Sequence, residues 1–154
     1  MDIDFKIFSN IESYDEIKEI MELRYKVFTG EKKFDPRYDF DEFDFTATHI
    51  AMILDGKTIG TTRIYKDNNR GNLGRLCVLA EYRNFKLSIP LLLKSYQVAV
   101  EMGFTEFDML AQYQLVPYYE KCGAIKTGEQ FILEDYPYVP MTIVFADIQK
   151  FTYE

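Results

Sequence analysis

The segment from Leu73 to Pro90 constrains the fold of this chain more than any other stretch. An apolar strand pattern runs from Leu73 to Leu79, and a short polar loop then leads into a strongly apolar helix at about residues 89–102. This order places a helix N-terminus, with its unpaired backbone N–H groups, beside the end of a strand. The segment is therefore a ready anion site. Every strand-to-helix unit shares this arrangement, so further motifs must decide what it does.

Strand and helix patterns alternate along the rest of the chain, which predicts an α+β fold. The pair Asp55-Gly56 between two apolar runs predicts a β-hairpin, and Ser13 with Glu16 predicts a capped helix that runs to about Phe28, with Gly30 as its stop. We expect one domain over residues 1–154, with a mixed, mostly antiparallel central sheet of about six to seven strands flanked by helices. The expected strands are 4–9, 49–54, 58–65, 73–79, 105–110, a strand at Phe131 and 139–145, and the expected helices are 13–28, 89–102 and 117–122, with a short helix within 31–46.

Charge and composition exclude several classes of partner. The net charge is −7, whereas binding to nucleic acid or to an anionic membrane needs clustered Lys and Arg, so we expect neither partner. Cys77 and Cys122 form no disulfide or metal pattern, and the acidic run from Asp39 to Asp44 lacks a ligand spacing, so we expect no metal. The sequence shows no signal-peptide pattern and no apolar run of roughly 18 residues, from which we expect a cytoplasmic protein.

Two further motifs carry polar chemistry. The stretch from Gln112 to Gly123 predicts a short helix that bears the adjacent Tyr118 and Tyr119. A phenol can give a proton to a thiolate leaving group, although two core rings are an equally simple interpretation. Arg24 falls near the middle of an apolar helix face, where an arginine is costly unless it is paired or faces a ligand. Its candidate carboxylate partners are Asp41, Glu42 and Asp44.

Together these segments resemble the GNAT N-acetyltransferase superfamily nearly end to end, and its ElaA-like branch most of all. The chain is more distantly similar to acyl-homoserine-lactone synthases and bacterial N-acyl amino acid synthases, which share its Leu-Arg-Tyr-x-Val-Phe opening. The resemblance implies that acetyl-CoA is the co-substrate and that its acetyl group passes to a primary amine by direct attack in a ternary complex. The supporting segments are Leu23–Glu31, His49, Leu76–Leu79, Gln112–Gly123 and Glu129–Met141.

The resemblance also implies where the co-substrate binds. The loop from Arg83 to Ser88 would hold the pyrophosphate with backbone N–H groups, helped by Arg83 or Lys86. The pantetheine arm would lie where the strand ending near Val78 splays from the strand at 105–110, and N–H groups near Cys77 and Val78 would polarise the thioester carbonyl. The expected co-substrate-binding residues are Leu76, Cys77, Val78, Arg83, Asn84, Phe85, Lys86, Leu87, Ser88, Gln114 and Tyr118.

For the reaction, Tyr119 matches the position of the family's general acid. The general base stays open among Glu31, Asp44, His49 and a water chain, and His49 is equally well explained as a structural residue. If Arg63 or Arg75 faces the cleft together with Arg24, the pocket is locally basic and favours an anionic amine, such as glucosamine 6-phosphate or an amino acid. The expected catalytic residues are Tyr119, Glu31 and His49, and the expected acceptor-binding residues are Arg24, Arg63, Arg75 and Asp44.

The chain departs from the family pattern at positions that bear on function. The family's loop reads Arg/Gln-x-x-Gly-x-Gly/Ala, and here Lys86 and Ser88 replace the glycine and the small residue. Gly74 stands where ElaA-like chains often carry an acid, and Tyr138 stands where they carry a histidine. Two alternatives therefore stay open: an acyltransferase that uses long-chain acyl thioesters, suited to an aromatic-rich cleft, and a non-catalytic domain that binds acyl-CoA. The resemblance implies a homodimer as one option for assembly.

Overall fold

The computed structural model describes residues 2–145, whose strands form one mixed eight-stranded sheet. The strand order is β1-β2-β3-β4-β5-β8-β6, and β7 pairs with β8. Only the β4–β5 pair is parallel, so the predicted mixed, mostly antiparallel α+β architecture is confirmed. The eighth strand was missed because β6 has only two residues. The strands are β1 Ile3–Ser9, β2 Thr48–Leu54, β3 Lys57–Asp67, β4 Arg70–Val78, β5 Glu106–Gln112, β6 Ile125–Lys126, β7 Phe131–Leu133 and β8 Tyr136–Val144.

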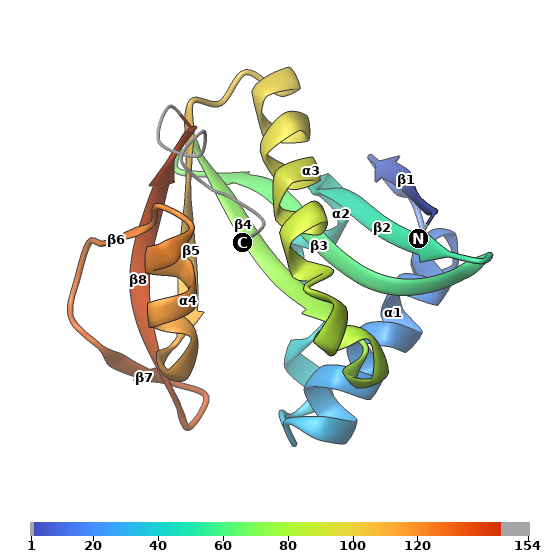
Figure 1. Ribbon diagram of the computed structural model, residues 1–154, viewed down its shortest axis with the longest axis horizontal. Helices are drawn as coiled ribbons and strands as arrows, with labels where there is room; N and C mark the ends of the chain where they lie inside the picture. The colour runs from blue at the N-terminus through green and yellow to red at the C-terminus, as the bar shows by residue number, and fades with distance from the viewer. Residues whose placement is uncertain (1, 146–154) are drawn as a thin grey trace.

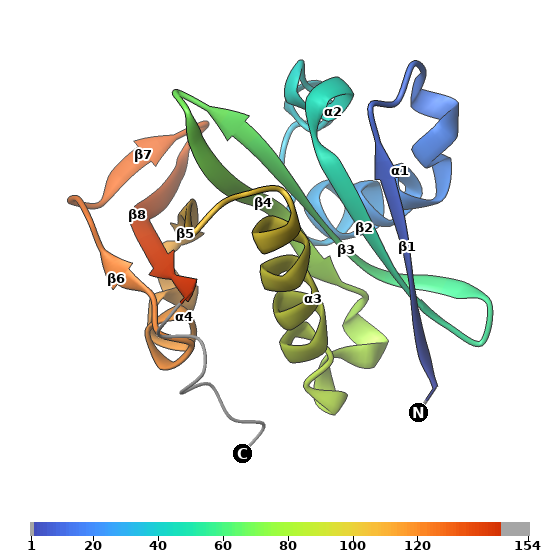
Figure 2. The same ribbon diagram turned by 90° about the horizontal axis from the view of Figure 1, so that it is seen from above.

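Helices cover both faces of the sheet (Figure 1). Strand β2 is buried along its whole length, because Ala51 and Ile53 pack against α1 while Ile50 and Met52 pack against α3. Figure 2 shows these two helices on opposite sides of β2 and β3. None of the described helices is long and apolar enough to cross a membrane. The helices are η1 Tyr14–Ile17, α1 Lys18–Arg24, η2 Tyr25–Glu31, η3 Pro36–Tyr38, α2 Phe43–Thr46, η4 Ala80–Phe85, α3 Ser88–Glu101, η5 Tyr113–Leu115 and α4 Val116–Lys121.

The first helical segment differs from the single helix that the sequence predicts. It begins as a 3-10 turn, continues as the α-helix α1 and ends as the π-helical η2, which passes through Gly30 and stops at Glu31. The prediction that Gly30 stops this helix is therefore wrong, and the helical segment ends at Glu31 rather than near Phe28. A π-helix adds a residue to each turn and is common at functional sites. Here it carries Thr29 to the wall of a cavity described below.

Two tight turns fix the register of the central strands. The predicted hairpin at Asp55-Gly56 is confirmed, and both residues have a positive φ. For the polar segment at residues 66–71 the sequence predicts a six-residue turn, which leaves the register of Arg63 and Arg75 open. The structure has a two-residue turn there, at Asn68-Asn69. This turn sets Arg63 directly opposite Gly74. The register that the sequence left open is thereby settled.

Strands β4 and β5 touch only at one end. Their pairing is limited to Gly71 with Phe107 and Asn72 with Asp108, and beyond these residues the two strands separate (Figure 1). The predicted splay of these strands is confirmed. The backbone of β4 beyond Asn72 therefore has an edge that β5 does not cover, and this edge lies within the sheet rather than at its border.

Lys86 occupies a backbone conformation that favours glycine. It ends η4 with φ 55°, directly before α3. We expect Lys86→Gly to raise the free energy of unfolding by about 0.5–1 kcal/mol, because an L side chain in the left-handed region is strained. The measurement is urea denaturation. Lys94→Gly, in the interior of α3, is the matched control and should lower stability by about 1 kcal/mol. A wild type that is as stable as Lys86→Gly would contradict the strain.

Candidate functional site

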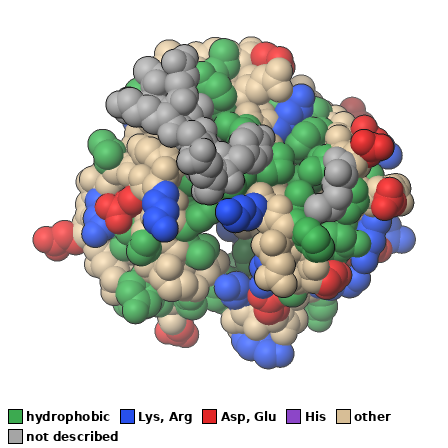
Figure 3. Space-filling model, viewed as in Figure 1, with side chains coloured by type: hydrophobic (Ala, Val, Ile, Leu, Met, Phe, Trp, Pro, Cys, Tyr) green, Lys and Arg blue, Asp and Glu red, His purple; other side chains and the backbone are tan. Residues whose placement is uncertain are grey.

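A cavity of about 870 Å³ opens beside the separation of β4 and β5. Its wall is formed by the segment from Phe28 to Phe43 together with β3, β4, β5, α4 and β8. The wall is rich in rings, and Figure 3 shows the molecule hollowed near the centre of one face. A concave, ring-lined space with a few polar groups is the usual form of a small-molecule site. The rings of the wall include Phe28, Phe34, Phe43, Tyr65, Tyr119 and Tyr138.

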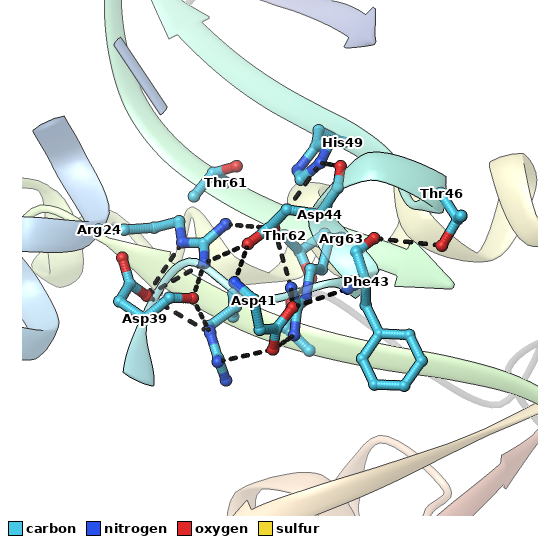
Figure 4. A network of polar contacts seen from close by, with 12 residues as sticks. Arg24, Asp39, Asp41, Phe43, Asp44, Thr46, His49, Thr61, Thr62 and Arg63 are labelled. Atoms are coloured by element: carbon cyan, nitrogen blue, oxygen red, sulfur yellow. Dashed lines mark hydrogen bonds and ion pairs between the residues drawn. The ribbon is translucent and has the colours of Figure 1, made fainter. Parts of the chain in front are cut away.

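A buried network of arginines and aspartates joins this wall to the sheet (Figure 4). Arg24 is fully buried and donates to Asp44 at 2.8 Å and to Asp39 at 3.1 Å. Arg63 donates to Asp41 at 2.6 Å and to Asp44 at 2.8 Å. The network ties α1, β3 and the segment 39–44 together. One of the pairings that the sequence offered for Arg24, the pairing with Asp44, is present.

Asp44 lies at the centre of the network. Burial favours its neutral form, but the ion pairs with Arg24 and Arg63 outweigh burial and hold its pKa at about 2. His49 donates from Nε2 to the backbone oxygen of Asp44 at 2.8 Å. Burial lowers the pKa of His49, so the ring is neutral near pH 7. None of Arg24, Asp44 and His49 lines the cavity, so the structure places these predicted site residues behind its wall.

Arg63 and Arg75 do line the cavity, and a bulge in β4 brings them to one wall. Between the pairs Thr61–Cys77 and Arg63–Gly74, β4 contains one more residue than β3, and Arg75 has φ 52°. Arg75 donates to the backbone oxygens of Tyr38 and Asp39 and to the carboxylate of Asp41. Both guanidiniums therefore have carboxylate partners.

The charge of the cavity differs from the locally basic pocket that the sequence suggested. Four arginines and five carboxylates line it, so its formal charge is −1. Arg63 and Arg75 share the cavity wall, as a basic pocket would require, but Arg24 does not line the cavity. The lining carboxylates also offset the positive charge of the arginines. The lining arginines are Arg37, Arg63, Arg70 and Arg75, and the lining acids are Asp35, Asp39, Asp41, Asp108 and Glu134.

The adjacent tyrosines of α4 point to different places. Tyr119 is 7% exposed and lines the cavity, and burial raises its pKa, so its hydroxyl stays protonated near pH 7. Tyr118 instead bonds through its hydroxyl to Ser88 Oγ at 2.8 Å, and burial raises its pKa to about 12. Tyr119 thus faces the cavity, while Tyr118 contacts the start of α3.

The predicted pyrophosphate loop lies outside the cavity, between β4 and α3. Within the part of the chain that the structure describes, the amides of Leu87 and Ser88 donate no hydrogen bond. Arg83 donates from Nε to the backbone oxygen of Val78 and forms an ion pair with Glu31 through both terminal nitrogens. Hydrogen bonding to Arg83 lowers the pKa of Glu31. Glu31 is therefore a weak proton acceptor near pH 7, and it does not line the cavity.

The structure brings only some of the predicted site residues together. Leu76, Arg63, Arg75 and Tyr119 share the cavity wall, whereas Cys77, Val78 and Gln114 do not contribute to it. Sequence reasoning missed Tyr65, Glu134 and Gln112, which also line the cavity. The alternation of β3, which places Tyr65 on the same face as Arg63, is a signal that could have found Tyr65. No group of three or more His, Cys, Asp or Glu side chains in residues 2–145 is arranged to hold a metal ion.

We expect Asp44→Asn to lower the free energy of unfolding by about 3–5 kcal/mol, because it leaves two buried guanidiniums under-compensated. The folded pKa of Asp44 lies below its ordinary value of 3.8. Its contribution is therefore complete above about pH 5 and is lost as the pH falls toward 2. Denaturant unfolding between pH 3 and pH 7 should show a flatter acid dependence in the variant.

The matched control for this prediction is Asp35→Asn. Asp35 forms an exposed ion pair with Arg37, which solvent screens, so its removal should change stability little. Similar losses in the two variants would contradict a stabilising role for the buried network.

Comparison with known proteins agrees with this geometry. Residues 32–145 match the family model described as an acetyltransferase (GNAT) domain. One relative is BSU40680 of Bacillus subtilis (strain 168), which is provisionally named an acetyltransferase. It is 31% identical over 135 residues, which cover 86% of this chain and 92% of that protein. YjcF of the same organism, named as an uncharacterized N-acetyltransferase, is 26% identical over 128 residues, covering 82% of this chain and 91% of that protein.

Solved structures share the fold. Escherichia coli ElaA superposes with a TM-score of 0.81 at 23% identity, covering 92% of this chain and 99% of that chain. The CoA-dependent acyl-homoserine lactone synthase BjaI, solved with SAM and isopentyl-CoA, superposes with a TM-score of 0.79 at 12% identity, covering 96% and 87%. These similarities match both branches that the sequence resembles. Because the family model spans most of the chain, and the splayed strands and the tyrosine-bearing helix stand where the resemblance placed them, this protein belongs to the GNAT acetyltransferase family and is an acyltransferase.

Proposed function

We propose that this enzyme transfers an acetyl group from acetyl-CoA to a primary amine of a small acceptor, by direct attack in a ternary complex. The observation that carries the proposal is the juxtaposition of three features: the uncovered edge of β4, the protonated hydroxyl of Tyr119 and the cavity that Tyr119 lines. The edge suits a thioester arm, the hydroxyl suits a leaving thiolate and the cavity suits an acceptor. Each feature has a distinct place in the reaction.

The donor would bind from the loop to the cavity. The free amides of Leu87 and Ser88, at the N-terminus of the 14-residue helix α3, suit a pyrophosphate, and the exposed Lys86 adds charge. Leu76, Cys77 and Val78 would flank the pantetheine arm along β4, with Tyr118 and Gln114 near its path. Arg83 is held by Glu31, so in this proposal it shapes the loop and contacts phosphate only if that ion pair opens.

The acyl transfer would take place at the cavity. The amine nitrogen attacks the thioester carbonyl carbon, a C–N bond forms and the C–S bond breaks, with the electron pair leaving on sulfur. Tyr119 gives its proton to that sulfur, which suits a phenol that stays protonated. The proton lost by the amine passes through water in the cavity and restores Tyr119. We favour the water chain as base because His49 and Asp44 lie behind the wall and Arg83 lowers the pKa of Glu31.

Of the acceptors that the sequence suggested, we propose an amino acid rather than a sugar phosphate. A dianionic phosphate needs unpaired positive charge, whereas Arg63 and Arg75 already face carboxylates and the cavity carries a net −1. A single carboxylate carries less negative charge than a phosphate and therefore needs fewer positively charged partners. The ring-lined wall would hold the acceptor's apolar part.

A second candidate keeps the reaction and changes the donor. The same ring-lined cavity has room for a fatty chain, which favours a long-chain acyl thioester over a domain that only binds acyl-CoA. Titration with acetyl-CoA against a long-chain acyl-CoA separates the two donors. Turnover with neither donor across a broad amine panel would leave the non-catalytic alternative.

Two finer expectations belong to this proposal. The buried cysteines Cys77 and Cys122 are free thiols, which suits the reducing cytoplasm. The three consecutive exposed apolar residues of β7, Phe131, Ile132 and Leu133, support a homodimer through this part of the sheet. Light scattering on the wild type and on Ile132→Lys tests the dimer.

We expect Tyr119→Phe to lower kcat by about 10²-fold or more while leaving the KM for acetyl-CoA nearly unchanged, because only the proton donor is removed. Steady-state kinetics provide the measurement. Tyr118→Phe is the matched variant. It loses the contact with Ser88 at the loop and should raise the KM for acetyl-CoA with a smaller effect on kcat. If both variants changed kcat equally, Tyr119 would not be the proton donor.

We also expect acetyl-CoA to raise the melting temperature of the wild type, and Lys86→Glu to reduce that shift, because it places a negative charge at the loop. Lys94→Glu, about two turns into α3, is the control and should keep the full shift in melting temperature. An unaltered shift in Lys86→Glu would place the pyrophosphate elsewhere, and no shift in the wild type would sink the donor assignment.

A further inference from the structure

An unfilled notch lies in the cavity wall at Gly74. Gly74 and Arg63 stand directly opposite each other on β4 and β3, so they share a face of the sheet. A Cβ atom added at Gly74 would meet only two heavy atoms within 4 Å, Tyr65 Cε1 at 3.5 Å and Arg63 Nε at 3.7 Å. The notch is therefore bounded by the backbone of Gly74, the guanidinium of Arg63 and the ring of Tyr65.

The guanidinium in this notch has an unused donor. Arg63 spends its terminal nitrogens on Asp41 and Asp44, but its Nε is buried and has no hydrogen-bond partner within residues 2–145. Arg63 is only 2% exposed and cannot turn outward, because two ion pairs and the ring of Tyr65, 4.9 Å from its Cζ, hold it in place. A buried donor that stays unpaired costs free energy, so a ligand oxygen at this point would be favoured.

The neighbouring side chains keep the notch open and rigid. Tyr65 stacks on Phe43 with ring centroids 4.5 Å apart, and Thr62 donates to the backbone oxygen of Gly74 at 2.9 Å. Gly74, Arg63, Tyr65 and Phe43 all line the cavity. Because Gly74 has no side chain, the space beside the buried Arg63 Nε at the cavity wall stays unfilled.

We infer that this notch is the subsite for an oxygen atom of the acceptor, a carbonyl or carboxylate oxygen that accepts a hydrogen bond from Arg63 Nε while the acceptor's amine faces the thioester. The inference rests on the proposed function and specifies its acceptor. Arg63 would bind the acceptor through Nε and already binds Asp41 and Asp44 through its terminal nitrogens. The residue that recognises the acceptor is thus part of the buried network. The adjoining rings would cover the acceptor's side chain.

The first test needs no substrate. Gly74→Gln and Gly74→Leu fill the notch with side chains of similar size, but only glutamine brings an oxygen to Arg63 Nε. We expect the glutamine variant to melt about 3 °C above the leucine variant, the effect of one buried hydrogen bond in a chain of this size. Equal melting temperatures would contradict the free donor at the notch.

The second test is calorimetric binding, in the presence of CoA, of three amines with one skeleton: L-phenylalanine, L-phenylalaninamide and 2-phenylethylamine. The wild type should bind the two amines that carry oxygen at least about tenfold more tightly than 2-phenylethylamine. Gly74→Leu should reduce this difference to less than about threefold, because it fills the notch. Gly30→Ala, a glycine outside the cavity with room for a methyl group, should preserve the difference.

The outcomes separate this inference from the function on which it rests. Equal binding of the three amines by the wild type, no binding of any of them, or a preference that survives in Gly74→Leu would overturn the subsite. Binding needs no turnover, so a wild type that binds as expected but transfers no acetyl group would count against the proposed reaction alone.

Discussion

The separation of β4 and β5 is the constraint on which the rest of the site depends. Parallel strands normally stay paired along their length, but here the pairing stops after Asn72 and Asp108. The backbone of β4 beyond Asn72 is stabilised by parts of the chain other than β5. Arg83 reaches back to the oxygen of Val78, and α3 packs its apolar face beside the same strand. Both contacts support β4 where β5 no longer pairs with it.

The buried arginines give the cavity its second fixed wall. A charged network behind a wall contributes little net stability compared with apolar packing, but it fixes geometry, because each guanidinium fork accepts only one arrangement of its carboxylates. Arg24 and Arg63 share Asp44, so the wall segment cannot shift without breaking both contacts. The strained backbone of Arg75 lies at the same place, which is typical of sites whose geometry serves function. In the proposed function, the network links the fold to the recognition of the acceptor.

The sequence predicted the fold well because the signals were local. Asp55-Gly56, Pro117 and the apolar run of α3 each act within a few residues, and the corresponding elements are present. The site was harder, because its residues meet across the sheet. The Asn68-Asn69 turn contains no glycine, and the polar run at residues 66–71 predicts a wider turn that leaves the pairing of Arg63 with Gly74 open. The carboxylates that offset the arginines come from a segment whose path no periodicity fixes, so the charge of the cavity could not be read from composition.

The proposed reaction depends on one place, the point where the uncovered edge of β4 meets the cavity. The decisive experiment is a crystal structure of the protein with acetyl-CoA. We expect the diphosphate against the amides of Leu87 and Ser88, the pantetheine arm along β4, and the thioester sulfur within hydrogen-bond reach of the Tyr119 hydroxyl. A co-substrate that lay outside the opening, or a thioester distant from Tyr119, would contradict it.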